Sequence, residues 1–110
     1  PSYLPESLCW MYSKEYMQTP GGHIRIFKKE FLKECFKELD LQLFKQHREH
    51  AMHSIYWILK ARNNMEEDKF LKSFHGLLVR QMFGQAKLSL FLERLLNPIF
   101  GKSECFYLRK

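Results

Sequence analysis

The sequence has few cysteines, and their arrangement does not predict a disulfide framework. The three cysteines, Cys9, Cys35 and Cys105, are an odd number and lie far apart. Small secreted domains that depend on disulfides usually carry an even and dense set. We therefore expect reduced thiols in an intracellular protein, nuclear or cytoplasmic. A secreted protein with a single Cys9–Cys105 bridge, and with Cys35 in its core, remains the alternative.

The chain also lacks a hydrophobic run of transmembrane length, and no signal peptide, repeat or low-complexity tract is visible. We therefore expect no membrane insertion. A chain of 110 residues fits one domain, residues 1–110, with a modest core. Because it begins at Pro1 rather than Met, we expect it to be processed or excised from a longer protein.

Recognised motifs for catalysis or cofactor binding are missing as well. The sequence contains no CxxC, no HExxH, and no phosphate-loop or dinucleotide pattern. Its carboxylates fall almost wholly on charged helix faces beside lysines, rather than in apolar settings that would shift their pKa values. Cys35 falls on an apolar helix face, which predicts a buried and inert thiol. We expect a protein that is not an enzyme, has no cofactor and shows no small-molecule substrate.

Aromatic and basic residues, in contrast, are plentiful. Ten Phe, five Tyr and two Trp supply enough apolar surface to offset the conformational entropy lost on folding. Lys and Arg number 18 against 12 Asp and Glu, which gives a formal net charge of +6. This balance permits contact with nucleic acid, an anionic membrane or an acidic partner, but it requires none of them.

Helical spacing of apolar residues predicts an all-α fold, a compact bundle of four to five helices. A short helix precedes a turn at Thr19–Gly22, and a second helix follows over residues 27–39. Beyond that point the apolar face rotates by about half a turn on a straight helix. We therefore place a break at residues 39–41, with Asp40 as the N-cap of a third helix that ends near Asn63.

The fourth helix follows, with Asn64 as its N-cap and Glu67 in capping-box position. Its apolar face continues past Gly84 without rotation, so Gly84 either ends the helix or lies within a longer one. Gly76 in mid-helix indicates a closely packed neighbour. The helix should stop at Asn97–Pro98, and the segment after it could be helix, strand or coil.

The segment "KQHREHAMHSIYW" raises the question of a metal site, because His47, His50 and His53 recur every third residue. On a straight helix, residues i and i+3 can share a zinc ion, but i+6 points about 120° away from i. A site would therefore need one pair and a further ligand, a cysteine or carboxylate brought close by folding. Because the sequence offers no recognised partner set, we expect no metal.

The same helix is apolar nearly all the way round over "AMHSIYWIL", so it is either central in the domain or covered by a partner. Trp and Tyr are enriched at interface hot spots. The leading hypothesis is a protein–protein interaction or dimerisation module whose partner is another protein or a second copy of itself. The candidate contact residues are His50, His53, Tyr56 and Trp57.

The alternative hypothesis is a helical nucleic-acid-binding domain. Arg80, Lys87 and Arg94 recur every seven residues, so they form one basic stripe if the helix is continuous through Gly84. Such a stripe could follow a phosphate backbone, although the aromatic residues nearby look like core rather than base-stacking platforms. The solvated face of a bundle helix explains the same pattern.

Overall fold

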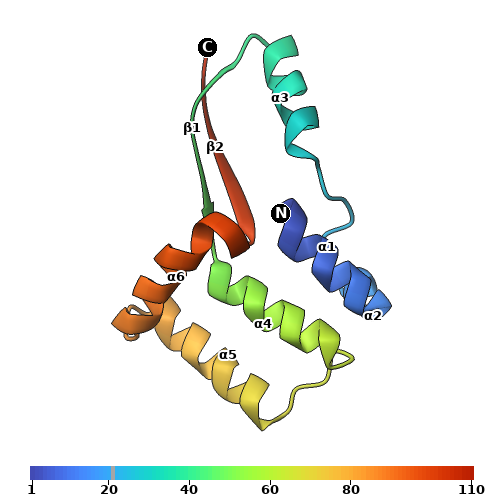
Figure 1. Cartoon of the computed structure of the whole chain (residues 1–110), viewed down its shortest axis with the longest axis vertical. Coiled ribbons are helices and arrows are strands. Elements are labelled where there is room, and N and C mark those ends of the chain that lie inside the picture. Colours follow the sequence, from blue (N-terminus) through green and yellow to red (C-terminus); the bar gives the residue numbers. More distant parts are fainter. Residues whose placement is uncertain (21) are drawn as a thin grey trace.

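A mixed fold of six helices and one two-stranded antiparallel sheet is found in the computed structural model, which describes residues 1–20 and 22–110. The helices are α1 (Tyr3–Tyr12), α2 (Lys14–Gln18), α3 (Lys29–Glu38), α4 (Ala51–Arg62), α5 (Lys69–Met82) and α6 (Lys87–Phe100). The strands are β1 (Gln42–Glu49) and β2 (Ser103–Arg109) (Figure 1). The predicted all-α bundle is therefore wrong, because the chain also forms a β-ribbon.

The ribbon joins two segments that are remote in sequence. β1 takes the place of the predicted start of the third helix, and β2 is the C-terminal segment, for which the sequence allows helix, strand or coil. Leu43 pairs with Leu108 and His47 with Cys105, and the register shifts between Leu43 and Lys45. The shift at Phe44 interrupts the two-residue alternation by which a strand is recognised.

The predicted break at residues 39–41 is confirmed, but Asp40 has a different role in it. Asp40 adopts a left-handed conformation with φ of 55° directly after α3. The Leu41 N–H donates to the carbonyl of Phe36 at 2.8 Å, and the Asp40 N–H donates to that of Lys37 at 3.1 Å. This pattern ends a helix. Asp40 therefore terminates α3 and does not cap a following helix.

The boundary between α4 and α5 also differs from the prediction. Asn64 and Met65 both have positive φ, so they form the turn after α4. Asp68 is the N-cap of α5, and its carboxylate accepts the Leu71 N–H at 2.8 Å. Glu67 instead accepts from Lys60 at 2.7 Å and from Tyr56, and so ties the turn to α4.

Three further expectations about glycine and proline are resolved. Gly84, with φ of 71°, separates α5 from α6, so the two are distinct helices. α6 runs through Pro98 to Phe100 rather than stopping at Asn97. The predicted neighbour of Gly76 does not exist, since no described residue comes within 4 Å of where its Cβ would lie. The predicted turn at Thr19–Gly22 includes Gly21, which lies outside the described residues.

α4 is the central helix and packs against α1, α5 and α6 (Figure 1). It contributes to both clusters of buried apolar side chains: Met52, Tyr56, Leu71 and Leu78 form one, and Cys9, Tyr16 and Ala61 form the other. Trp57 packs against both clusters. The apolar character of α4 on all sides is thus explained by neighbours within the chain.

α3 lies apart from the other helices, beside the far end of the ribbon (Figure 1). None of its residues is buried; Phe31 on its apolar side is 50% exposed, and Leu39 directly after the helix is 65% exposed. Cys35 is only half-buried, so the prediction of a buried thiol is wrong for it, whereas Cys9 is buried. The radius of gyration is 15.6 Å, against about 13 Å for a compact domain of this length. The chain is more extended than a bundle.

Candidate functional site

The four residues predicted to contact a partner do not form one exposed surface. His50 is exposed at the junction before α4, and His53 is half-buried in the first turn. Tyr56 is only 4% exposed and lies in the core, where its hydroxyl donates to Glu67. A partner could therefore reach the histidines but not Tyr56.

Trp57, the fourth of these residues, is half-buried by side chains of this chain. The Tyr16 ring meets it edge-on, with 5.6 Å between ring centroids. The ammonium groups of Lys60 and Lys102 lie 5.3 Å and 5.2 Å from the centre of the indole. Such cation–π contacts hold the lysine stems against the ring.

The three histidines separate into one single residue and one pair. His47 lies in β1, opposite Cys105, with its ring stacked on Tyr107 at 5.4 Å between centroids. His50 has a left-handed backbone, φ 68° and ψ 42°, directly before α4. The ring of His53 lies 5.6 Å from that of His50. The straight helix assumed for all three residues does not form, and only His50 and His53 come together.

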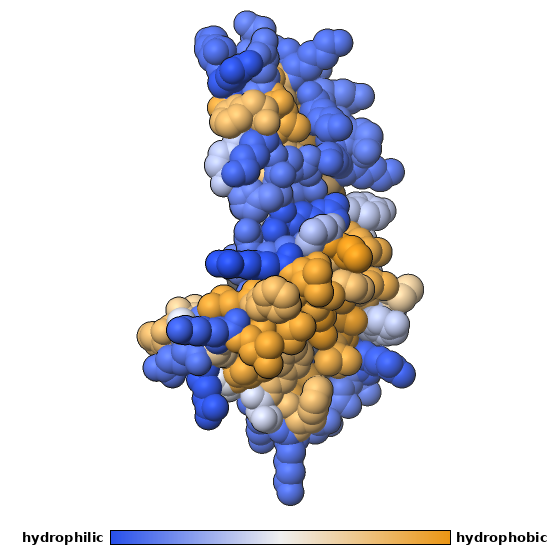
Figure 2. Space-filling model, turned by 60° about the vertical axis from the view of Figure 1, so that its left-hand side comes forward, coloured by the Kyte–Doolittle hydropathy of each residue, from blue (hydrophilic) through white to orange (hydrophobic). Residues whose placement is uncertain are grey.

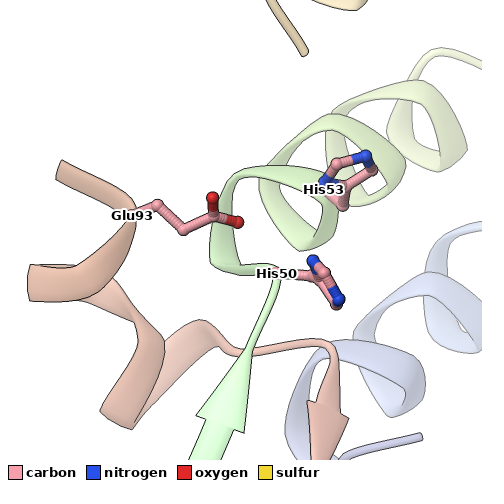
Figure 3. A group of neighbouring side chains, drawn as sticks. All are labelled: His50, His53 and Glu93. Atoms are coloured by element: carbon pink, nitrogen blue, oxygen red, sulfur yellow. The ribbon is translucent and has the colours of Figure 1, made fainter. Parts of the chain in front are cut away.

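Glu93 of α6 joins this pair. One nitrogen or carboxylate oxygen from each of His50, His53 and Glu93 lies within 4.8 Å of the other two. In Figure 3 the Glu93 carboxylate extends from α6 toward the start of α4; the His53 ring comes from the first turn of that helix and the His50 ring from the residue directly before it. The three residues line a hollow of about 410 Å³ together with Trp57, Gln81 and Lys102.

The polar atoms in this group are only partly paired. The Gln81 side-chain amide donates to Oε2 of Glu93. Oε1 of Glu93 and Nδ1 of His53 are buried and have no hydrogen-bond partner in the part of the chain that the structure describes. Burial raises the pKa of Glu93, although nearby His50 opposes this, and burial lowers the pKa of His53. Both shifts reflect the cost of charge in a poorly solvated place.

Asn97 holds the two elements that carry this group together. It lies four residues after Glu93 on α6, and its Oδ1 accepts the Ala51 N–H at 3.0 Å. Its Nδ2 donates to the Glu49 carboxylate at 2.8 Å. The His50 side chain makes no capping hydrogen bond to any described residue. Asn97 of α6 therefore satisfies the first backbone donor of α4.

A second polar cluster lies on the other side of Trp57. The Glu6 carboxylate is 1% exposed and accepts from the Tyr16 hydroxyl at 3.0 Å. His23 Nδ1 lies 2.9 Å and Lys102 Nζ 3.8 Å from it. Burial and Glu6 raise the pKa of Tyr16 far above its usual value, and burial lowers that of Lys102. Because its groups pair with one another, this cluster serves to join α1 to the start of β2.

α6 buries a row of polar residues and exposes a row of apolar ones, although its Leu96 packs, partly buried, against the cluster formed by Met52, Tyr56, Leu71 and Leu78. Ser89, Glu93 and Asn97, spaced four residues apart, are buried. The apolar side chains on the opposite side are between 41% and 75% exposed, and they are Leu88, Phe91, Leu92, Leu95 and Ile99. We call these five residues the α6 face. Figure 2, which brings the side of α5 and α6 forward, shows a broad apolar area over this half of the molecule.

The apolar face that was expected to continue past Gly84 as core is therefore largely exposed. Leu71 and Leu78 of α5 are buried, but Phe70, Met82 and Phe83 are at least 64% exposed. The reason is the reversal at Gly84, which gives α6 a direction of its own. The apolar spacing that continues from α5 into α6 therefore does not determine which side of α6 packs against α4.

The basic stripe does not form on one helix. Arg80 lies on α5, whereas Lys87 and Arg94 lie on α6 beyond the break at Gly84, and all three are exposed. Arg80 borders a hollow with Phe70, and Arg94 borders a different one with His47. The continuous helix on which the stripe depends is replaced by two helices.

Neither a protein-family model, nor a curated protein, nor a solved structure matches this chain. Over residues 1–20 and 22–110, none of the helices combines the length and the apolar character needed to cross a membrane. Function is therefore inferred from the side chains themselves.

Proposed function

We propose that this protein is a non-enzymatic protein–protein interaction module that pairs with a second copy of itself through the α6 face. The observation that carries the proposal is the orientation of α6, whose polar row is buried while its apolar row faces solvent. Contiguous apolar patches larger than a few hundred Å² are rare on monomers and mark association sites.

The size of the face fits a pair of copies. Phe91 is 64% exposed and Leu95 66% exposed, and the other three residues lie between 41% and 75%. If each large apolar side chain offers roughly 180 Å² when fully exposed, the face presents on the order of 500 Å². Two copies would then bury on the order of 1,000 Å², which is the lower limit for a specific interface.

The spacing of the face also suits a second α6. Leu88, Leu92, Leu95 and Ile99 follow the spacing i, i+4, i+7 and i+11, which is the apolar seam of paired helices. Such a seam is self-complementary, as a two-fold interface requires. α3 also carries exposed apolar residues, but without a buried polar row behind them.

Charge beside the face predicts how salt should act. Lys87 and Arg94 are exposed basic residues on α6, and its only acidic residue, Glu93, is buried. Two copies would bring like charges together, so screening by salt should strengthen the pair. Binding to an acidic protein or to an anionic membrane surface would instead weaken with salt.

The test is the mass in solution across a wide range of protein concentration, at low and at high salt. We expect a transition from 13.4 kDa to twice that mass, shifted to lower concentration by salt. Leu95→Glu should keep the chain monomeric. Leu39→Glu, directly after α3, is the matched control, because Leu39 is 65% exposed and lies outside the face.

A monomer at every concentration, or an unchanged dimer in Leu95→Glu, would reject the proposal. Vesicles containing phosphatidylserine provide the second arm. If the monomer binds them, and less well at high salt, the α6 face belongs to a membrane surface rather than to a protein interface.

A further inference from the structure

We propose that His50, His53 and Glu93 bind one Zn²⁺ ion between α4 and α6, with its fourth coordination position open to the hollow beside them. The site would link the first turn of α4 to the middle of α6. It shares no residue with the α6 face, so it can be tested separately from self-association.

The donor set suits this ion. Two imidazole nitrogens and one carboxylate oxygen form a common three-ligand zinc site that leaves one position open. Softer cations such as Cu⁺ are less suited, because no thiolate takes part. Harder cations such as Mg²⁺ and Ca²⁺ are less suited, because only one carboxylate takes part. The carboxylate is the additional ligand that the histidine pair lacks on α4 itself.

The distances require only a modest movement. The three ligand atoms lie within 4.8 Å of one another. Zinc–ligand bonds of about 2.0–2.1 Å in a tetrahedron place ligand atoms roughly 3.4 Å apart. Closing the difference requires side-chain rotation within the hollow, for which the exposed His50 side chain has room.

The unpaired atoms of the site support a bound cation. Glu93 is 8% exposed, and its Oε1 has no hydrogen-bond partner among the described residues, as is also true of His53 Nδ1. Buried polar atoms are nearly always paired, and an ion is one of the few explanations for an exception. In this case one ion would engage the carboxylate and both rings.

All three side chains line one hollow before any ion binds. His50 adopts a left-handed conformation between β1 and α4, as Asp40 and Asn64 do at other element ends, and this turn leads directly into the first turn of α4. The Asn97 hydrogen bonds to Ala51 and Glu49 fix α4 against α6 one turn from Glu93. The two halves of the site are therefore held in place by contacts other than the metal.

The nearest lysine does not occupy the site. Lys102 lines the same hollow, but its ammonium group donates to the Tyr16 hydroxyl at 2.9 Å and lies 3.8 Å from the Glu6 carboxylate. Its ammonium group is thus paired within the second polar cluster, although its charge is still close enough to help lower the pKa of His53. Glu93 supplies the negative charge on the side facing them.

The experiment is titration of the purified chain with Zn²⁺ alone by calorimetry, and with Co²⁺ by visible absorption. We expect one ion per chain and the intense d–d bands of tetrahedral Co²⁺, which Zn²⁺ then displaces. His50→Ala, His53→Ala and Glu93→Gln should each weaken binding at least about tenfold, since even indirect supporting residues have effects of this size. Circular dichroism of each metal-free variant shows whether it is folded.

Three controls distinguish this site from others. His75→Ala removes an exposed histidine of α5, and Cys105→Ser removes the thiol opposite His47 in the ribbon, so both should bind Zn²⁺ as the parent does. Leu95→Glu should also bind normally. Equal affinity in the parent and in all three site variants, no binding by the parent, or loss of binding in Cys105→Ser would overturn the proposal.

Discussion

Replacing Asn97 with alanine should destabilise the fold although Asn97 touches no ligand and lies near the end of a helix. The change removes an acceptor for the Ala51 N–H and a donor to Glu49. Loss of a helix cap costs about 1 kcal/mol, and loss of a hydrogen bond to a charged group costs about 1.5–3 kcal/mol. Because Glu49 is partly exposed, we expect the lower end of that range and a total of about 2.5 kcal/mol.

The measurement is urea unfolding followed by circular dichroism, at a concentration where parent and variant are both monomeric. The midpoint should fall with an unchanged slope, and thermal unfolding should occur roughly 10 °C lower. Ser89→Ala is the matched control, since Ser89 is buried on the same side of α6 but bonds only within its own turn, to the Ala86 carbonyl. If Asn97→Ala stays within about 0.5 kcal/mol of the parent, α6 does not cap α4 as described.

Four further predictions concern other parts of the chain. In the folded protein Cys35 and Cys105 should react with a thiol reagent before Cys9, which is buried with its pKa raised to about 11, and all three should react in denaturant; a single reactive thiol would indicate a disulfide instead. Lys60 and then Tyr56 lower the pKa of Glu67 from 4.5 to about 2, so its stabilising effect is present above pH 4.5 and is lost as the pH falls toward 2. Glu67→Gln should therefore flatten the pH dependence of urea unfolding over that interval, and an unchanged slope would show that the contact is not formed. Gly76→Ala should raise stability by about 1 kcal/mol, because its Cβ would meet none of the described residues; destabilisation would reveal a close neighbour. Titration with DNA and RNA at two salt concentrations should show no steep salt dependence, because Arg80 and Arg94 lie on separate helices; a steep dependence would favour the nucleic-acid hypothesis.

Local spacing predicted most of the helices but could not predict the ribbon. α5 and α6 follow a 3.6-residue period that is contained within each segment. β1 has to pair with β2, at the other end of the chain. Leu41 and Phe44 also fit a helix, and the register shift at Phe44 removes the alternation that would have contradicted it. Only the pairing itself decides between the two structures.

The larger error of the sequence-based prediction concerned which side of α6 is buried. We assumed that an apolar helix face points inward, but α6 buries Ser89, Glu93 and Asn97 instead. A signal was present, since these three polar residues share one side at a spacing of four. Their reason for being inside is specific, because Asn97 bonds to the start of α4 and Glu93 accepts from Gln81. Periodicity alone carries no such information.

The candidate metal site was partly accessible from the sequence. The sequence shows that a histidine pair on one helix needs a further ligand from elsewhere, a cysteine or a carboxylate, but it led us to expect no metal. Glu93 could not be identified, because its place depends on the reversal at Gly84 and on the side of α6 that meets α4. His47 was expected to be helical, whereas that residue lies in β1.

The position of Trp57 against both apolar clusters has a consequence for how the chain unfolds. Because α4 and its indole ring are common to both clusters, neither can open while the other stays intact. Hydrogen exchange should therefore detect one cooperative unit that includes α1, α4 and α5, with the slowest amides in α4. α3, which has no buried residue, should exchange its amides long before that unit opens. α3 would then unfold independently of the cooperative unit formed by α1, α4 and α5.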